Sequence, residues 1–131
     1  MKYINKKLTI ENVKVQNIAK KFGTPAYCYS YNQLKKNINN FKKSFKSFSP
    51  LICFAIKSNT NVNLISEIRK LGLGADVVSV GELMKALKAG IKPNKIVFSG
   101  VGKTVEEIKY AINKKILLIN AESKSEIFEI E

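Results

Sequence analysis

Beyond residue 50, the sequence alternates between short apolar segments and amphipathic helical patterns. The apolar segments begin near Leu51, Ala75, Lys95 and Ile116, and a helical pattern follows each of them. Strands that alternate with helices in this way return to the same side of a sheet through crossovers, which makes the sheet parallel. The sequence therefore predicts an α/β fold with about four βα units.

Three of the helices after these strands carry their own start signals. A serine or threonine is followed three residues later by a glutamate at Ser79, Thr104 and Ser123. This spacing is typical of a capping box, in which each side chain accepts a hydrogen bond from the backbone of the other residue. Each of the three residues is therefore predicted to be an N-cap.

Residues 1–29 are less regular than the rest of the chain. Their loosely alternating apolar residues predict strands and loops, followed by a turn at residues 23–25 and a short strand over residues 26–29. Ser30 and Gln33 have the spacing of a capping box and predict the start of a helix. We expect a β-containing N-terminal segment over residues 1–29 and an α/β domain over residues 30–131.

Four βα units fit either an open doubly wound sheet or the first half of a (β/α)8 barrel, which needs about 250 residues. Both architectures place their chemistry at the C-terminal ends of the strands. Lys57 and Asp76 lie at two such ends, and the later strands end at residues 99–100 and 120–122. The last helical pattern runs to Glu131 without a C-cap signal, so we expect the front part of a longer protein.

The segment over residues 51–59 is predicted to be a strand that ends near Lys57. Alternation places Lys57 on one face with Ala55 and Cys53, and larger apolar residues on the other. An ammonium group in a strand is costly unless it is paired or takes part in chemistry. The alternative is a strand end at which Lys57 reaches solvent.

Composition argues against several classes of function. The net charge is +13, yet every basic residue except Arg69 is lysine, whereas nucleic-acid recognition favours arginine, so we expect no nucleic-acid partner. The chain has neither a long apolar run nor the apolar core of a signal peptide, which predicts a cytoplasmic protein without a membrane partner. It contains no histidine for a Ser/His/Asp or Cys/His system or a metal site, and Cys28 and Cys53 are expected to be buried thiols.

Two glycine-containing segments resemble nucleotide-binding motifs only in part. Residues 100–104 (Gly-Val-Gly-Lys-Thr) match the end of a phosphate-binding loop, but Val97 stands where that loop needs its first glycine. Residues 72–74 (Gly-Leu-Gly) precede a strand, whereas a dinucleotide fingerprint follows one. We predict that neither segment binds a nucleotide.

The motif over residues 55–59, Ala-Ile-Lys-Ser-Asn, resembles the Ala-x-Lys-x-Asn motif of the pyridoxal-phosphate enzymes with an alanine-racemase-like barrel. Residues 24–27, 74–83, 96–104 and 120–123 resemble further strands of that family, in the same order. The similarity covers residues 20–131 and is greatest to members that act on meso-2,6-diaminopimelate. Two departures are mild, since Val80 and Ala121 stand where glycine and valine are usual.

This resemblance implies that residues 30–131 are the N-terminal portion of a (β/α)8 barrel that binds pyridoxal 5'-phosphate. Lys57 would form the Schiff base with the cofactor and later carry protons from a partly desolvated barrel mouth. Asp76 would hold Lys57 or the imine in place, with a structural ion pair as its alternative. Ala55 would line the cofactor site. Glu82 would either contribute to that site or complete the capping box of Ser79.

The resemblance also implies a reaction, the decarboxylation of meso-2,6-diaminopimelate to L-lysine by a homodimer of the complete enzyme. The phosphate anchor, the acid at the pyridine nitrogen and the residues that read the substrate would come from later strands, so we expect the 131 residues alone to be inactive. Two alternatives remain open. One is another enzyme of the same fold, either a basic amino-acid decarboxylase or an amino-acid racemase, and the other is a non-catalytic module that has lost the cofactor.

Overall fold

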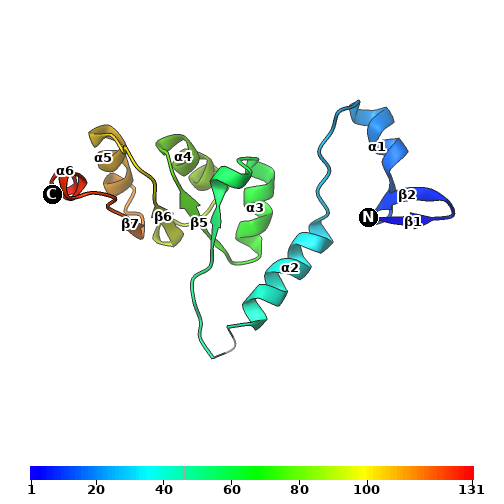
Figure 1. Cartoon of the computed structure of the whole chain (residues 1–131), viewed down its shortest axis with the longest axis horizontal. Coiled ribbons are helices and arrows are strands. Elements are labelled where there is room, and N and C mark those ends of the chain that lie inside the picture. Colours follow the sequence, from blue (N-terminus) through cyan, green and yellow to red (C-terminus); the bar gives the residue numbers. More distant parts are fainter. Residues whose placement is uncertain (46) are drawn as a thin grey trace. The chain divides into compact units, whose positions relative to one another are not determined.

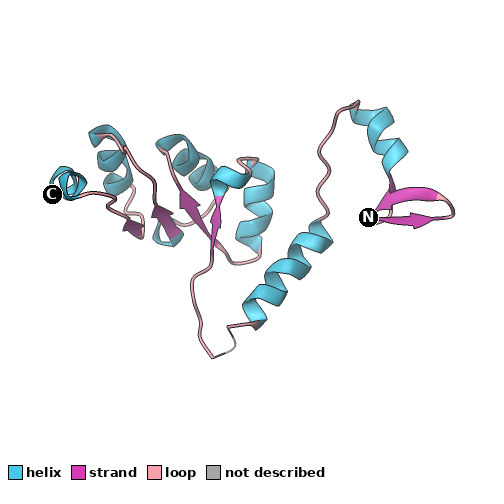
Figure 2. Cartoon of the chain, in the orientation of Figure 1, coloured by secondary structure: helices cyan, strands magenta, loops and turns pink. Residues whose placement is uncertain are grey.

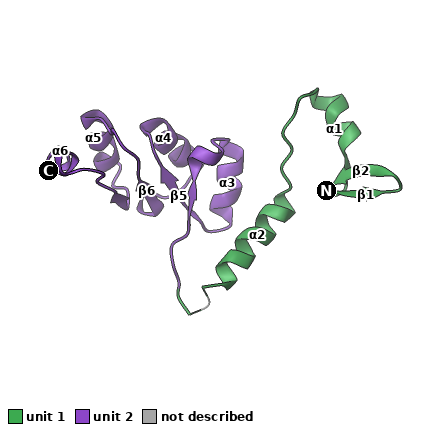
Figure 3. Cartoon of the chain, viewed as in Figure 1, with its two compact units in different colours: residues 1–48 green, residues 49–131 purple. Residues whose placement is uncertain are grey.

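The computed structural model describes residues 1–45 and 47–131. These residues form two compact units, residues 1–48 and residues 49–131 (Figure 3). Helix α2 (Tyr31–Lys43) is thus grouped with the first unit, and the boundary expected before residue 30 stays a prediction. Among the described residues, no helix is both long and apolar enough to cross a membrane.

The first unit begins with an antiparallel sheet in the order β1-β2-β3 (Figure 2). Its elements are β1 (Lys2–Ile4), β2 (Lys7–Ile10), β3 (Val13–Lys14), α1 (Val15–Phe22) and α2. The sequence prediction missed α1, whose residues Val15, Ile18 and Phe22 recur at the helical period, because Val13 and Val15 also fit a strand. The strand expected over residues 26–29 is wrong. Those residues are exposed and lie in no ladder, and Cys28, expected to be buried, is exposed with them.

The start of α2 and the hydrogen bond from Gln33 to its N-cap, Ser30, are confirmed, but the Gln33 side chain does not make the return bond. The Ser30 hydroxyl accepts a hydrogen bond from the backbone of Gln33 at 3.1 Å, whereas the Gln33 side chain donates to Asn37. The reciprocal carboxylate is Glu11, which accepts from the Ser30 hydroxyl and from the backbone of Asn32. The pKa of the Glu11 carboxyl is held below its usual value mainly by the hydrogen bond from the Asn32 backbone, and secondly by the bond from Ser30.

The second unit contains a parallel sheet in the order β4-β5-β6-β7 (Figure 1). Successive strands are neighbours, whereas a doubly wound sheet reverses its strand order, so the barrel-like arrangement of four βα units is confirmed. The elements are β4 (Cys53–Ala55), η1 (Ile56–Ser58), α3 (Val62–Lys70), β5 (Gly74–Val77), α4 (Val80–Lys88), η2 (Pro93–Lys95), β6 (Ile96–Phe98), α5 (Val105–Asn113), β7 (Leu118–Ile119) and α6 (Lys124–Ile130).

One face of this sheet is packed and the other is more open. Two register rows, Phe54–Ala75–Ile96 and Val77–Phe98–Ile119, face a core that includes Ile65, Leu83, Ala86 and Ala111 from the helices. Alternation sends the row of Ala55, Asp76, Val97 and Leu118 to the opposite face, and none of these four side chains is fully buried. The polar groups of the strand ends therefore lie on the open face.

The three predicted N-caps of this unit are confirmed at Ser79, Thr104 and Ser123. Only Thr104 forms the reciprocal box, with Glu107. The Glu107 carboxylate also accepts a hydrogen bond from the backbone of Val80, the first residue of α4, at 2.9 Å. Its pKa is held below the usual value by the backbone donors of Val80 and Thr104.

Candidate functional site

Lys57 lies just beyond the end of β4, in the short helix η1, and not within a strand. The Ser58 hydroxyl donates to the Ala55 carbonyl at 2.7 Å, and the Asn59 amide donates to the Ile56 carbonyl at 2.9 Å, which closes a tight turn. The strand predicted over residues 51–59 is therefore too long. The turn keeps Ile56 fully buried, so the apolar alternation continues through a segment whose backbone is no longer extended.

The Lys57 side chain is exposed, and among the described residues nothing forms a hydrogen bond or an ion pair with it. The partial desolvation expected for this lysine is therefore not provided by residues 1–45 and 47–131. The structure supplies an accessible primary amine at the C-terminal end of a parallel strand, which is where barrel enzymes place reactive groups.

Asp76 and Ala55 are register partners on β5 and β4, so they lie side by side on the open face of the sheet. Gly74 and Cys53 form the pair before them. A Cβ atom at Gly74 would collide with the Lys95 carbonyl oxygen and lie 3.0 Å from the Cys53 sulfur, so only glycine fits there. The space at Gly74 is thus filled by the Lys95 carbonyl, and the side chain beside Asp76 in the register is the small one of Ala55.

The charge of Asp76 is felt at Cys53. Burial raises the pKa of the Cys53 thiol above its usual value, and the negative charge of the Asp76 carboxylate raises it further. Less of the Cys53 thiol is therefore ionised at neutral pH than of an ordinary cysteine, which makes it a weaker nucleophile.

Asp76 also belongs to a hydrogen-bonded row that joins three strand ends. The Ser99 hydroxyl, after β6, donates to Asp76 Oδ1 at 2.7 Å, and the Asn120 side-chain amide, after β7, donates to the Ser99 hydroxyl at 3.0 Å. The sequence placed Ser99 and Asn120 at strand ends but did not connect them to Asp76. Their position at the same edge of a parallel sheet was the available signal.

Glu82 completes a capping arrangement at the start of α4. Its backbone amide donates to the Ser79 hydroxyl at 3.2 Å, and its carboxylate accepts from the backbone amide of Val78 at 3.0 Å. The reciprocal bond is thus made with the residue before the N-cap and not with Ser79 itself. This geometry favours the structural explanation of Glu82 over a role toward a cofactor.

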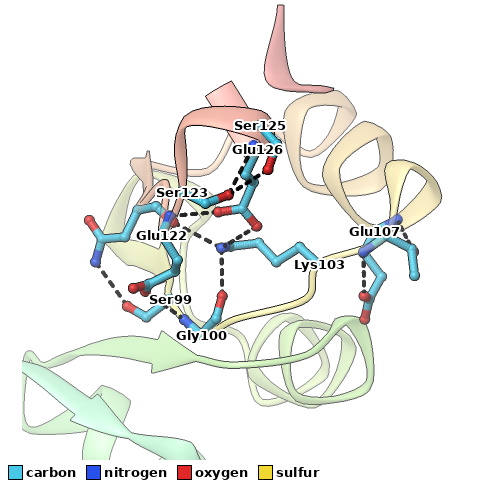
Figure 4. A network of polar contacts seen from close by, with 10 residues as sticks. Ser99, Gly100, Lys103, Glu107, Glu122, Ser123, Ser125 and Glu126 are labelled. Carbon is cyan, nitrogen blue, oxygen red and sulfur yellow. Dashed lines mark hydrogen bonds and ion pairs between the residues drawn. The ribbon is translucent and has the colours of Figure 1, made fainter. Parts of the chain in front are cut away.

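Lys103, from the segment that resembles a phosphate-binding loop, is a structural residue (Figure 4). Its ammonium group donates to the carbonyls of Gly100 at 2.7 Å and Asn120 at 2.8 Å, and to Glu126 Oε1 at 3.0 Å. The side chain of Lys103 is 1% exposed and that of Glu126 is 9% exposed. Because all three protons of the ammonium group have protein acceptors, Lys103 has none to offer a phosphate.

Glu126 is the anionic half of this buried pair and also caps α6. It accepts a hydrogen bond from the backbone of Glu122 at 2.7 Å, as well as from Lys103. The pKa of the Glu126 carboxyl is held below its usual value mainly by the hydrogen bond from the Glu122 backbone, and secondly by the bond from Lys103. The ion pair therefore links α6 to the ends of β6 and β7.

Residues 31–131 match the family model described as pyridoxal-dependent decarboxylase, pyridoxal binding domain. The chain belongs to this family. It is 49% identical over 110 residues to a diaminopimelate decarboxylase of Helicobacter pylori and 44% identical over 127 residues to that of Aquifex aeolicus. These alignments cover 84% and 97% of the chain, but only 27% and 30% of the two relatives.

Solved structures show the same relationship. A crystal structure of H. pylori diaminopimelate decarboxylase complexed with L-lysine matches with a TM-score of 0.86 at 44% identity, over 90% of this chain and 30% of that one. A crystal structure of diaminopimelate decarboxylase from M. jannaschii in co-complex with L-lysine matches with a TM-score of 0.92 at 37% identity, over 96% of this chain and 30% of that one. The chain thus has the fold of the first part of these enzymes.

Proposed function

We propose that this chain provides the lysine-bearing part of a pyridoxal-phosphate enzyme that decarboxylates meso-2,6-diaminopimelate to L-lysine. The observation that carries the proposal is the accessible Lys57 amine at the end of β4, next to the strand that bears Asp76. Two of the similar enzymes are described as complexes with L-lysine, the product that this reaction would release. A cytoplasmic homodimer with a small amino-acid substrate is part of the same proposal.

The residues present fit the cofactor. Lys57 offers an amine without a competing partner among the described residues, and the neighbour of Asp76 on β4 is the small residue Ala55. When bound, pyridoxal phosphate supplies an electron sink for the electrons released by loss of carbon dioxide. Lys57 would bind the cofactor's aldehyde carbon through Nζ and hold or release a proton at that atom, while Asp76 would orient the amine by charge and hydrogen bonding.

The experiment that tests the reaction measures carbon dioxide and L-lysine formed by the intact, cofactor-loaded enzyme. We expect turnover of meso-2,6-diaminopimelate and much slower turnover of ornithine and arginine. The isolated 131 residues are the control and should show no turnover above free cofactor. In the sheet of the described residues β4 and β7 each pair on one side only, so the four strands do not close a barrel around the open face. Faster turnover of ornithine or arginine, racemisation, or failure to bind the cofactor would each overturn the proposal.

Asp76→Asn is expected to lower kcat by more than about tenfold, or about 1.4 kcal/mol of barrier, because the amide cannot hold a cationic amine in place. It should also lower the pKa of Cys53, since Asp76 is one of the two causes that raise it. Peptide-resolved alkylation of Cys53 in cofactor-free enzyme should therefore become faster at a fixed pH below that pKa. Unchanged kinetics together with lower thermal stability would identify Asp76 as a purely structural residue.

A further inference from the structure

The row formed by Asp76, Ser99 and Asn120 has a defined direction. Ser99 has a single hydroxyl proton and donates it to Asp76 Oδ1, so its lone pairs remain to accept from Asn120. Asn120 therefore presents its amide NH2 group and not its oxygen. Both donors point toward the carboxylate, which is the acceptor at the end of the row.

The backbone under this row is fixed independently of the three side chains. The Ser99 amide donates to the Val77 carbonyl at 2.8 Å, and the Asn120 amide donates to the Phe98 carbonyl at 2.9 Å, which extends both ladders beyond the strands. Ser99 and Asn120 thus start from positions that the sheet already sets. From these positions the Ser99 side chain reaches Asp76 and the Asn120 side chain reaches Ser99.

Lys103 adds a second constraint to the same segments. Its ammonium group holds the carbonyl of Gly100, the residue after Ser99, and the carbonyl of Asn120 itself (Figure 4). The Gly100 amide in turn donates to Glu122 Oε1 at 3.2 Å. The spacing between the ends of β6 and β7 is therefore held by Lys103 as well as by the bond between Ser99 and Asn120.

We propose that Ser99 and Asn120 are positioning residues that hold the Asp76 carboxylate in one orientation for the reaction. Ser99 occupies Oδ1 and Asn120 holds the Ser99 hydroxyl, which leaves Oδ2, without a hydrogen-bond partner among the described residues, for the Lys57 amine or the cofactor. This inference rests on the proposed role of Asp76. It assigns to residues of the third and fourth βα units a function in a site whose reactive groups belong to the first and second.

A double-mutant cycle in the intact enzyme tests this inference. Ser99→Ala should lower kcat by about tenfold in the native background, but by less than about twofold in the Asp76→Asn background, because the residue acts only through Asp76. Ser99→Thr, which keeps the hydroxyl, should retain activity to within about twofold. Asn120→Ala should produce a smaller loss, about threefold, since Ser99 keeps its own bond to Asp76.

Two further measurements separate positioning from stability. The dissociation constant of pyridoxal 5'-phosphate, titrated into cofactor-free enzyme, should increase in both Ser99→Ala and Asp76→Asn. The pH midpoint of the bound cofactor's absorbance should shift in the same direction in both variants. A purely structural role for Ser99 would instead lower the melting temperature and leave the cofactor's affinity and absorbance unchanged.

The outcomes distinguish the two proposals. If Asp76→Asn leaves turnover, cofactor affinity and absorbance unchanged, the proposed role of Asp76 is wrong and the positioning role is wrong with it. If Asp76→Asn impairs all three but Ser99→Ala impairs none, or if the two effects multiply, only the positioning role of Ser99 and Asn120 is overturned.

Discussion

Lys57→Ala is expected to lower turnover by at least about a thousandfold, or about 4 kcal/mol of barrier, while the enzyme stays folded. The large kinetic effect follows because the amine is the group proposed to bind the cofactor covalently. The small structural effect follows because the Lys57 side chain is exposed and has no hydrogen-bonding or ionic partner among the described residues, whereas its neighbour Ile56 is fully buried. We expect the free energy of unfolding to change by less than about 0.5 kcal/mol.

Borohydride reduction of the cofactor-loaded enzyme, followed by peptide mapping, should label Lys57 and no other lysine in this chain. Lys85→Ala is a matched control, since that lysine is exposed on α4 and should affect neither labelling nor turnover. Labelling of a peptide that does not contain Lys57 would contradict the proposal that Lys57 binds the cofactor. Loss of folding in Lys57→Ala would support a structural role for the residue instead.

Lys103→Met should destabilise the fold by about 3–5 kcal/mol, because it leaves the buried carboxylate of Glu126 without its cation. The double variant Lys103→Met/Glu126→Gln should recover part of this loss. A glutamine oxygen can still accept the hydrogen bond from the Glu122 backbone, and no unpaired charge remains buried at this site. Denaturant unfolding of the intact enzyme measures both free energies.

The exposed pair between Lys70 and Glu67 is the matched control for this measurement. Its side chains are 55% and 37% exposed, so Lys70→Met should cost no more than about 0.5 kcal/mol. Equal effects of Lys70→Met and Lys103→Met would contradict the interpretation of Lys103 as a buried structural cation. Tighter phosphate binding by the native enzyme than by Lys103→Met, at equal stability, would contradict it as well.

The sequence predicted the second unit better than the first because its signals are local and repeated. Each βα unit carries an apolar strand, an amphipathic helix and an N-cap, and the order of the strands follows from crossovers of one kind. Helix α1 was missed because Val13 and Val15 fit a strand while Val15 and Ile18 fit a helix. Alternation alone could not show that the chain turns after Ala55, since Ile56 stays buried in either geometry.

The candidate site was only partly predictable for a different reason. Lys57 and Asp76 stand in recognisable positions at strand ends, but the link from Asp76 to Ser99 and Asn120 depends on the register between three strands. Hydrophobic alternation rules out a shift of one residue between neighbouring strands, because such a shift would turn every side chain to the other face, but it does not distinguish shifts of two residues. Lys103 shows the converse, because its Gly-x-Gly-Lys-Thr setting matches a local motif while its contacts give it another purpose.

Glu107 has a consequence for how the second unit unfolds. One of its carboxylate oxygens caps its own helix, α5, through the Thr104 backbone, and the other accepts from Val80 at the beginning of α4. Local unfolding of α5 therefore also removes a hydrogen-bond acceptor from the first turn of α4. This hydrogen bond couples the starts of α4 and α5, so we expect hydrogen exchange at the first turn of α4 to become faster when Glu107 is replaced by alanine.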